Sequence, residues 1–169
     1  MDRRYEIIKS ASSITVSTLA LSLSILRAYT AINHLISAYL YIDLFYTTKW
    51  DMFIHHTSTL LFLTSVRNVQ YETFSQQTNA IINMEISTIF LGFISLFRER
   101  VIPVSKTLAN LNQFAFMVTF TKFRIWDYFW HVIAINEYPN EKTKAALITL
   151  FLLDCYWFVL ICKKAMKQF

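Results

Sequence analysis

The chain has 169 residues, a net charge of +5 and 55% hydrophobic residues. Its charged fraction of 16% is well below the roughly 25% of soluble domains. One glycine and two prolines are too few for a loop-rich β protein, because strands need frequent turn residues. A soluble helical protein would need helices with wide polar faces, which these segments lack. The composition predicts an all-α membrane protein.

Apolar segments separated by short polar links occupy nearly the whole chain. A helix needs about 20 mostly apolar residues to cross a bilayer, with a range of about 17 to 25. We therefore expect a polytopic bundle of about six transmembrane helices in one domain, residues 1–169. The expected helices are 8–27, 29–47, 50–67, 77–97, 107–128 and 144–163.

The first of these segments is expected to remain in the protein, because no small-residue cleavage site follows its apolar run. Ser13, Ser17, Ala20 and Ser24 recur in it at spacings of four, three and four. Small side chains on one helical face let another helix approach closely. This face is a predicted packing seam.

Lysine and arginine are unevenly divided between the two sides of the expected bundle. One side holds Arg3, Arg4, Lys9, Lys49, Arg98, Arg100, Lys106, Lys163, Lys164 and Lys167, and the other Arg27, Arg67, Lys142 and Lys144. The positive-inside rule then predicts that both termini are cytosolic. Because topology accounts for the positive charge, we expect no nucleic-acid partner.

The stretch YIDLFYTTKWDMFIHH places Asp43, His55 and His56 in apolar surroundings around a polar break. A charged residue at a bilayer centre costs roughly 2.5 to 3.5 kcal/mol on insertion scales, so it usually pairs, lines a cavity or takes part in chemistry. Asp43 precedes the expected turn at 47–50 by about as many residues as His55 follows it. All three side chains should therefore lie at similar depth, toward the cytosolic face.

Further polar residues join this predicted site. Tyr39, Asp43 and Tyr46 lie at i, i+4 and i+7 on one helical face, and Thr59 lies four residues after His55. Together they predict a polar pocket.

The histidine pair favours acid–base chemistry over metal binding. Helical metal sites use residues three or four apart, whereas adjacent residues point about 100° apart, so we expect no metal. Histidine can take and return a proton near neutral pH. The alternative is that His55 and His56 only hydrogen-bond to tyrosine, threonine or backbone groups between helices. His34 and His131 are expected at the other membrane face.

A second polar group is expected deeper in the later helices. Glu85 should lie at the depth of Lys122 and Arg124, and an intramembrane ion pair with either is the least costly arrangement. Asp154 lacks an obvious partner and fits either polar group. Cys155 and Cys162 lie two turns apart on one helix, about 10 Å, which is too far for a disulfide.

Four segments, in order, resemble the TLC-domain family. They are YLYIDLFYTTKWDMFIHHTSTLLFL, NMEISTIFLGF, FMVTFTKFRIW and LLDCYWFVLICKKAMK. In that family a Tyr and an Asp-Leu pair end one transmembrane helix and a His-His pair enters the next. The matches extend from about Tyr41 to Lys167.

The resemblance implies a lipid-related function. The family includes ceramide synthases, which transfer an acyl group from acyl-CoA to a sphingoid amine and need the histidine pair that corresponds to His55 and His56. Asp43 would orient one imidazole. The synthases also carry acidic residues in a His-Asp-x-Ser-Asp segment. This chain reads NMEIST there, closer to family members implicated in lipid sensing.

Three functions therefore follow as hypotheses: an N-acyltransferase, a non-catalytic lipid-sensing or lipid-regulating protein, and a scaffold for other membrane proteins. The expected partners are membrane lipids, acyl-CoA as a co-substrate, and further copies of the chain in a homo-oligomer. No resident cofactor is expected. The resemblance implies the endoplasmic reticulum membrane as the location.

Overall fold

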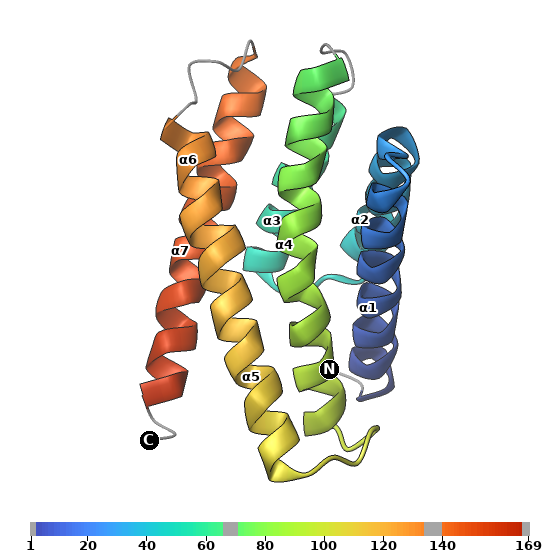
Figure 1. The fold of residues 1–169 in the computed structure, drawn as a ribbon, viewed down its shortest axis with the longest axis vertical. Coiled ribbons are helices and arrows are strands. Elements are labelled where there is room, and N and C mark those ends of the chain that lie inside the picture. The colour runs from blue at the N-terminus through green and yellow to red at the C-terminus, as the bar shows by residue number, and fades with distance from the viewer. Residues whose placement is uncertain (1–2, 66–70, 134–139, 167–169) are drawn as a thin grey trace.

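The computed structural model describes residues 3–65, 71–133 and 140–166, which form a bundle of helices along one long axis (Figure 1). The elements are α1 (Arg3–Ile25), α2 (Tyr29–Tyr46), α3 (Trp50–Ser65), α4 (Tyr71–Arg98), α5 (Lys106–Phe120), the π-helix η2 (Thr121–Asp127), α6 (Tyr128–Ile133) and α7 (Glu141–Met166). Because α5, η2 and α6 are consecutive, the described chain has six helical rods. The all-α prediction is confirmed, and each expected segment overlaps one rod.

Two of the links between helices begin with the same backbone turn. Arg27 after α1 and Arg100 after α4 have positive φ angles of 54° and 55°. After α1, the backbone N–H of Arg27 donates to Ser24 O at 2.9 Å and that of Ala28 to Leu23 O at 3.0 Å. After α4, the N–H of Arg100 donates to Phe97 O at 3.1 Å and that of Val101 to Leu96 O at 3.0 Å. This is the Schellman motif, in which glycine is the usual residue at the left-handed position. An arginine there costs about 1 kcal/mol.

Side-chain caps start two of the later helices. Ser105 Oγ accepts a hydrogen bond from the backbone N–H of Leu108 at 3.2 Å at the start of α5. Asn140 Oδ1 accepts one from the N–H of Lys142 at 2.8 Å at the start of α7. Each cap satisfies an N–H group that the helix itself leaves without an acceptor.

Helices α1 and α4 pack closely along the predicted seam. Ser17 and Ala20 of α1 are 1% and 0% exposed, which confirms the seam at these two positions. On α4, a Cβ atom at Gly92 would lie 2.5 Å from Ile14 Cγ1 and 3.3 Å from Ser10 O. The single glycine of the chain therefore lies where the two helices come too close for a larger residue.

The apolar core lies between α1, α2, α3, α4 and α7. Its most buried side chains come from all five helices, and they are Ala20, Ile32, Leu63, Ile82 and Leu147. Large apolar side chains also cover the outside, among them Phe45 and Leu26, which are 87% and 75% exposed. An apolar exterior of this kind suits contact with lipid chains. Cys155 and Cys162 are free thiols.

Among the described residues, three helices are long and apolar enough to cross a membrane: Arg3–Ile25, Thr78–Arg98 and Glu141–Met166. These three helices support the prediction of a membrane protein. Helices α2 and α3 have 18 and 16 residues, which is about 27 and 24 Å at 1.5 Å per residue, less than the roughly 30 Å hydrocarbon core.

The short α2–α3 hairpin also determines where the predicted site lies. Helix α1 begins and α7 ends at the lower end of the bundle in Figure 1. The link between α2 and α3 lies well above the lower ends of α4 and α5. Residues beside that link are therefore inside the length of the bundle rather than at its end.

Candidate functional site: a buried Asp–His pair

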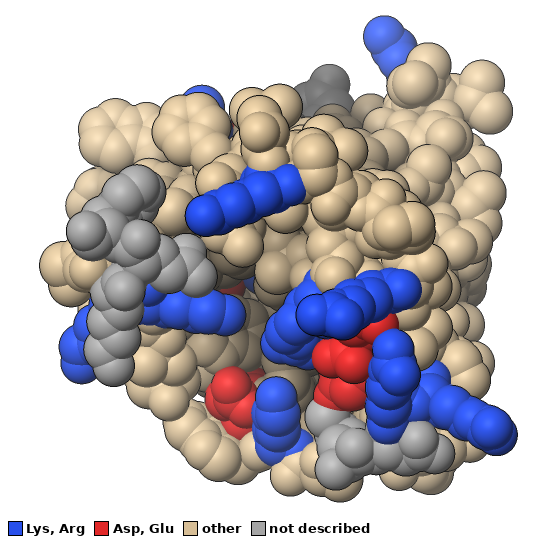
Figure 2. Space-filling model, turned by 90° about the horizontal axis from the view of Figure 1, so that it is seen from below, with Lys and Arg blue, Asp and Glu red and all other residues tan. Residues whose placement is uncertain are grey.

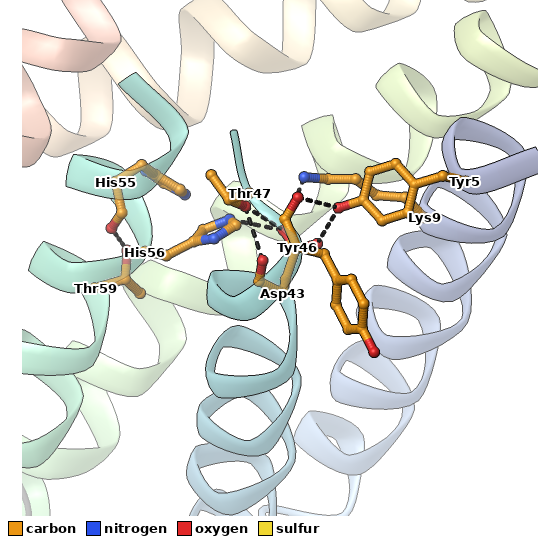
Figure 3. Close-up of polar contacts among 8 residues, drawn as sticks. All are labelled: Tyr5, Lys9, Asp43, Tyr46, Thr47, His55, His56 and Thr59. Atoms are coloured by element: carbon orange, nitrogen blue, oxygen red, sulfur yellow. Dashed lines mark hydrogen bonds and ion pairs between the residues drawn. The ribbon is translucent and has the colours of Figure 1, made fainter. Parts of the chain in front are cut away.

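The carboxylate of Asp43 is the centre of the polar site at the end of α2. Its side chain contacts groups from α1 and α3 (Figure 3). The Nζ atom of Lys9 lies 2.9 Å from Asp43 Oδ2, and the Nε2 atom of His56 lies 3.4 Å from the same oxygen. Asp43 and His56 are 6% and 3% exposed. Two helices next to α2 thus each contribute a nitrogen to one buried carboxylate.

The local sequence explains why Asp43 and His56 meet. A three-residue link, 47–49, joins α2 to α3, so the ends of the two helices lie side by side. Thr47 Oγ1 donates a hydrogen bond to the backbone carbonyl of Asp43 at 2.8 Å and lies 3.5 Å from its Oδ2. The prediction that Asp43 and the histidine pair lie at similar depth is confirmed for His56.

Two α1 residues of the site were absent from the predicted set. The Tyr5 hydroxyl donates its one proton to the backbone carbonyl of Tyr46 at 3.1 Å and lies 3.5 Å from Asp43 Oδ1. Tyr5 and Lys9 are four residues apart, so they lie on one face of α1. The position of Lys9, just inside an apolar helix, is a sequence signal that could have identified it.

His55 lies on the other side of His56, against α7. The His55 ring centroid is 5.6 Å from that of His56 and 5.2 Å from that of Trp157. The indole Nε1 of Trp157 donates to Asp51 Oδ2 at 2.9 Å, which fixes the orientation of the indole. The Nδ1 atoms of both histidines are buried, without a hydrogen-bond partner among the described residues. Buried ring nitrogens of this kind are available to a ligand.

The remaining predicted pocket residues lie around this centre with unequal roles. Thr59 Oγ1 donates to the carbonyl of His55 at 2.8 Å, so it supports α3 rather than contacting an imidazole. Tyr39 is half-buried against the apolar core. Tyr46 is 60% exposed, and it is its backbone carbonyl that binds Tyr5. In Figure 3 the Tyr46 ring points away from Asp43.

A second buried cluster forms around Arg124 of η2. Its guanidinium donates from Nε to Ser87 Oγ at 2.9 Å, from Nη1 to Asp154 Oδ1 at 3.2 Å and from Nη2 to Thr88 Oγ1 at 3.1 Å. Arg124 and Asp154 are 6% and 1% exposed. The second oxygen of Asp154, Oδ2, is buried and has no partner among the described residues. The ion pair thus joins η2 to α7 and also reaches α4.

This cluster differs from the expected pairing of Glu85 with Arg124 or Lys122. Glu85 accepts a hydrogen bond from Ser17 Oγ at 2.5 Å, and it therefore faces α1. Ser87, which binds Arg124, lies two positions further on α4, about 200° around the helix. The prediction from depth gave the right level of Glu85 along the bundle axis. It gave the wrong face of α4, because Glu85 lies on the face toward α1 and Ser87 lies on the face toward Arg124.

Lys122 also has another partner, because it forms an ion pair with Asp127. Both residues belong to η2, whose wider turn the sequence analysis did not predict. Short π-helical segments occur frequently at functional sites. Asp154, which the sequence left open to either cluster, belongs to that of Arg124.

The groups that this site offers to a ligand are the imidazoles of His55 and His56 and the carboxylate of Asp43. In the parts of the chain that the structure describes, no group of three or more His, Cys, Asp or Glu could hold a metal ion. The other two histidines lie elsewhere: His34 is exposed on α2, and His131 is half-buried on α6.

Comparison with known proteins adds no relative to this description. A scan against models of protein families, a search of curated proteins and a search of solved structures each found no match.

Proposed function

We propose that the chain is a multi-pass membrane protein that acts on a lipid amine, with His56 as the general base of an N-acyl transfer. One observation carries this proposal. Asp43 lies at the Nε2 side of the His56 ring, while Nδ1 is buried and without a partner among the described residues. A carboxylate at one ring nitrogen favours the proton there, and the other nitrogen then keeps its lone pair for a substrate.

The proposed reaction joins a sphingoid amine to the acyl group of an acyl-CoA thioester. The amine nitrogen attacks the thioester carbonyl carbon and forms the C–N bond, and His56 Nδ1 takes the proton that the nitrogen loses. The C–S bond then breaks, and the leaving CoA thiolate takes that proton from the imidazolium. The products are an amide and CoA thiol, and the histidine returns to its neutral form.

The neighbouring residues have distinct parts in this reaction. Lys9 lies 2.9 Å from Asp43 Oδ2 and compensates the charge of this carboxylate in its buried position. His55 offers a second buried nitrogen next to His56, suited to donate a hydrogen bond to the oxyanion that develops on the thioester carbonyl. Lys9 and Asp43 are positioning residues, and His55 and His56 are the groups that would touch substrate.

Two further expectations belong to this proposal. The resemblance of four ordered segments to the TLC-domain family supports a lipid substrate and a location in the endoplasmic reticulum membrane. The ten basic residues assigned to the side that holds both chain ends support six crossings with cytosolic termini. Acyl-CoA would then approach the site from the cytosol, and the lipid amine from the bilayer.

A non-catalytic lipid-sensing or lipid-regulating role is the second candidate, and one observation favours it. His56 is 3% exposed and Lys9 occupies one oxygen of Asp43. A substrate would have to move at least one of these groups to reach the imidazole. A protein that only recognises a head group could use the same cluster without turnover.

The two candidates are separated with purified protein in lipid nanodiscs. Nanodiscs holding wild type, His55→Ala or His56→Ala receive a sphingoid base and acyl-CoAs of several chain lengths, and amide product is measured by mass spectrometry. Catalysis requires product in wild type that is lost in both variants. If wild type forms no amide with any acyl-CoA but retains the base, and Asp43→Asn loses this retention, the protein binds lipid without turnover.

A further inference from the structure

A pocket of about 620 Å³ lies at the lower end of the bundle, away from the histidine pair. It is formed by the last turns of α4, the link 99–105, the first half of α5 and one residue of α7. The residues that line it and enter the argument are Ile94, Phe97, Arg98, Arg100, Ile102 and Lys164. Figure 2 shows this lower face, where Lys and Arg side chains, with Asp and Glu side chains among them, surround a hollow.

The positive charge at this pocket is only partly compensated. Glu99 is the adjacent carboxylate, and it is already paired with Arg3 at 3.4 Å and with Arg98 at 3.3 Å. Arg100 and Lys164 make no ion pair with the described residues. Two cationic groups without an ion-pair partner in the described part of the chain therefore face one cavity, which favours an anionic ligand.

The walls of the pocket are apolar. Ile94 and Phe97 of α4 and Ile102 of the link lie beside the cationic groups. A small soluble anion would gain nothing from such walls, whereas a lipid presents a charged head group and an apolar chain together. The mixed lining therefore fits a lipid better than a free ion.

The position of the pocket along the bundle agrees with this ligand. Two of the helices that are long and apolar enough to cross a membrane, Thr78–Arg98 and Glu141–Met166, end at this pocket. The ends of such helices lie at the level of the lipid head groups. Basic pockets between helices at this level are typical binding sites for anionic lipid head groups.

We propose that this pocket binds the phosphate of an anionic phospholipid, with Arg100 and Lys164 contacting the phosphate and Ile94 and Phe97 contacting an acyl chain. The site is separate from the histidine pair. Lys164 follows Trp157 by seven residues, so it lies on the same face of α7, about 10 Å further along the axis. The proposal stands whether or not His56 is catalytic.

The test uses two double variants with the same change in charge. Arg100→Gly with Lys164→Gln removes both free cations from the pocket. Arg27→Gly with Lys142→Gln is the matched control, because Arg27 occupies the same left-handed position at the end of α1, outside the pocket lining. Glycine relieves the backbone at either site, so both double variants should unfold at or above the wild-type temperature.

Binding of phosphatidic acid, phosphatidylcholine and inorganic phosphate to the purified, delipidated chain is measured by native mass spectrometry and by titration. Each lysine or arginine near a lipid surface changes affinity by roughly fivefold. The pocket variant should therefore bind phosphatidic acid about thirtyfold more weakly than wild type, while the control stays within about threefold.

Three results would overturn the proposal. They are equal affinity of wild type for phosphatidic acid and phosphatidylcholine, an equal loss in the control variant, and inorganic phosphate binding as tightly as the lipid. The last would show a general anion site rather than a lipid site. Preserved thermal stability of the pocket variant excludes unfolding as the cause of a loss.

Discussion

His56 and Asp43 approach each other across the turn between α2 and α3, with 3.4 Å between Nε2 and Oδ2. Both side chains are nearly inaccessible, and Lys9 shares the same carboxylate oxygen at 2.9 Å. The carboxylate thus contacts one cation and one imidazole. This arrangement leads to separate expectations for catalysis, for stability and for topology.

Asp43→Asn should impair the proposed acyl transfer without removing the side chain. An amide can turn its NH₂ group toward Nε2, which favours the wrong imidazole tautomer, as in the Ser-His-Asp triad. We expect the rate of amide formation to fall by about 10²- to 10⁴-fold. The measurement is initial rate in nanodiscs at saturating acyl-CoA.

Asp51→Asn is the control for this change. Asp51 is a nearby carboxylate that accepts a hydrogen bond from Trp157 Nε1, and the asparagine oxygen can still accept that bond. The control should retain its rate within about threefold, since it leaves the tautomer of His56 unchanged. Similar losses in both variants would mean that Asp43 has no special part.

The buried pair of Arg124 and Asp154 should be strongly coupled in stability. Removing one partner leaves a buried charge uncompensated, so Arg124→Leu or Asp154→Leu should each lower the free energy of unfolding by about 3–5 kcal/mol. Replacing both should cost clearly less than the sum of the single changes. The free energy of unfolding is measured in mixed micelles by circular dichroism for wild type, the two single variants and the double variant, which completes the double-mutant cycle.

Lys122→Leu provides the comparison for that cycle. Lys122 pairs with Asp127, but its side chain is 55% exposed, and exposed pairs contribute about 0–1 kcal/mol. Additive effects of Arg124→Leu and Asp154→Leu would contradict the coupling of this pair. A Lys122→Leu effect as large as theirs would contradict the difference expected between a buried and an exposed ion pair.

Gly92→Ala should destabilise the contact between α1 and α4. The added Cβ would lie 2.5 Å from Ile14 Cγ1 and 2.9 Å from its Cδ1, and overpacking of this kind costs about 1–3 kcal/mol. Ile14→Ala removes both crowded atoms, so Gly92→Ala should cost less in an Ile14→Ala background than in wild type. If Gly92→Ala lowers the free energy of unfolding by the same amount in both backgrounds, Ile14 is not the source of the strain.

The helices were largely predictable, because the residues of each segment themselves determine whether that segment is helical. Runs of apolar residues determine where helices form, and short polar links with few breakers mark where they end. The 47–49 link also made the meeting of Asp43 and His56 predictable, because a hairpin brings its two ends together. Lys9 and Tyr5 come from a different helix, and spacing along the chain does not encode which face of α1 turns toward α2.

The ion pairs of the later helices also depend on which face of each helix turns toward its neighbour, and the sequence does not show this. Depth along the bundle axis was used to pair Glu85 with Arg124, but depth leaves the rotation of each helix undetermined. The π-helical turn η2 changes the face on which Arg124 lies, and the sequence carries no plain signal for it. Asp154, a buried acid without a local partner, is the residue that Arg124 meets.

Cysteine labelling tests the proposed topology. In a background with Cys155→Ser and Cys162→Ser, Lys106→Cys reports the lower end of the bundle and Lys142→Cys the opposite end. In sealed microsomes whose cytosolic face points outward, a membrane-impermeant maleimide should label Lys106→Cys at once. It should label Lys142→Cys only after permeabilisation. The reverse pattern, or labelling of both in sealed vesicles, would contradict cytosolic termini.

The most direct test of His56 as the general base measures, in the same nanodiscs, how much sphingoid base is retained and how much amide product is formed. It compares His56→Ala with His34→Ala, since His34 is an exposed histidine on α2. We predict that His56→Ala retains the base within about twofold of wild type but loses about 10²- to 10⁴-fold in product, while His34→Ala changes neither. Product formation by His56→Ala at the rate of His34→Ala would contradict His56 as the general base.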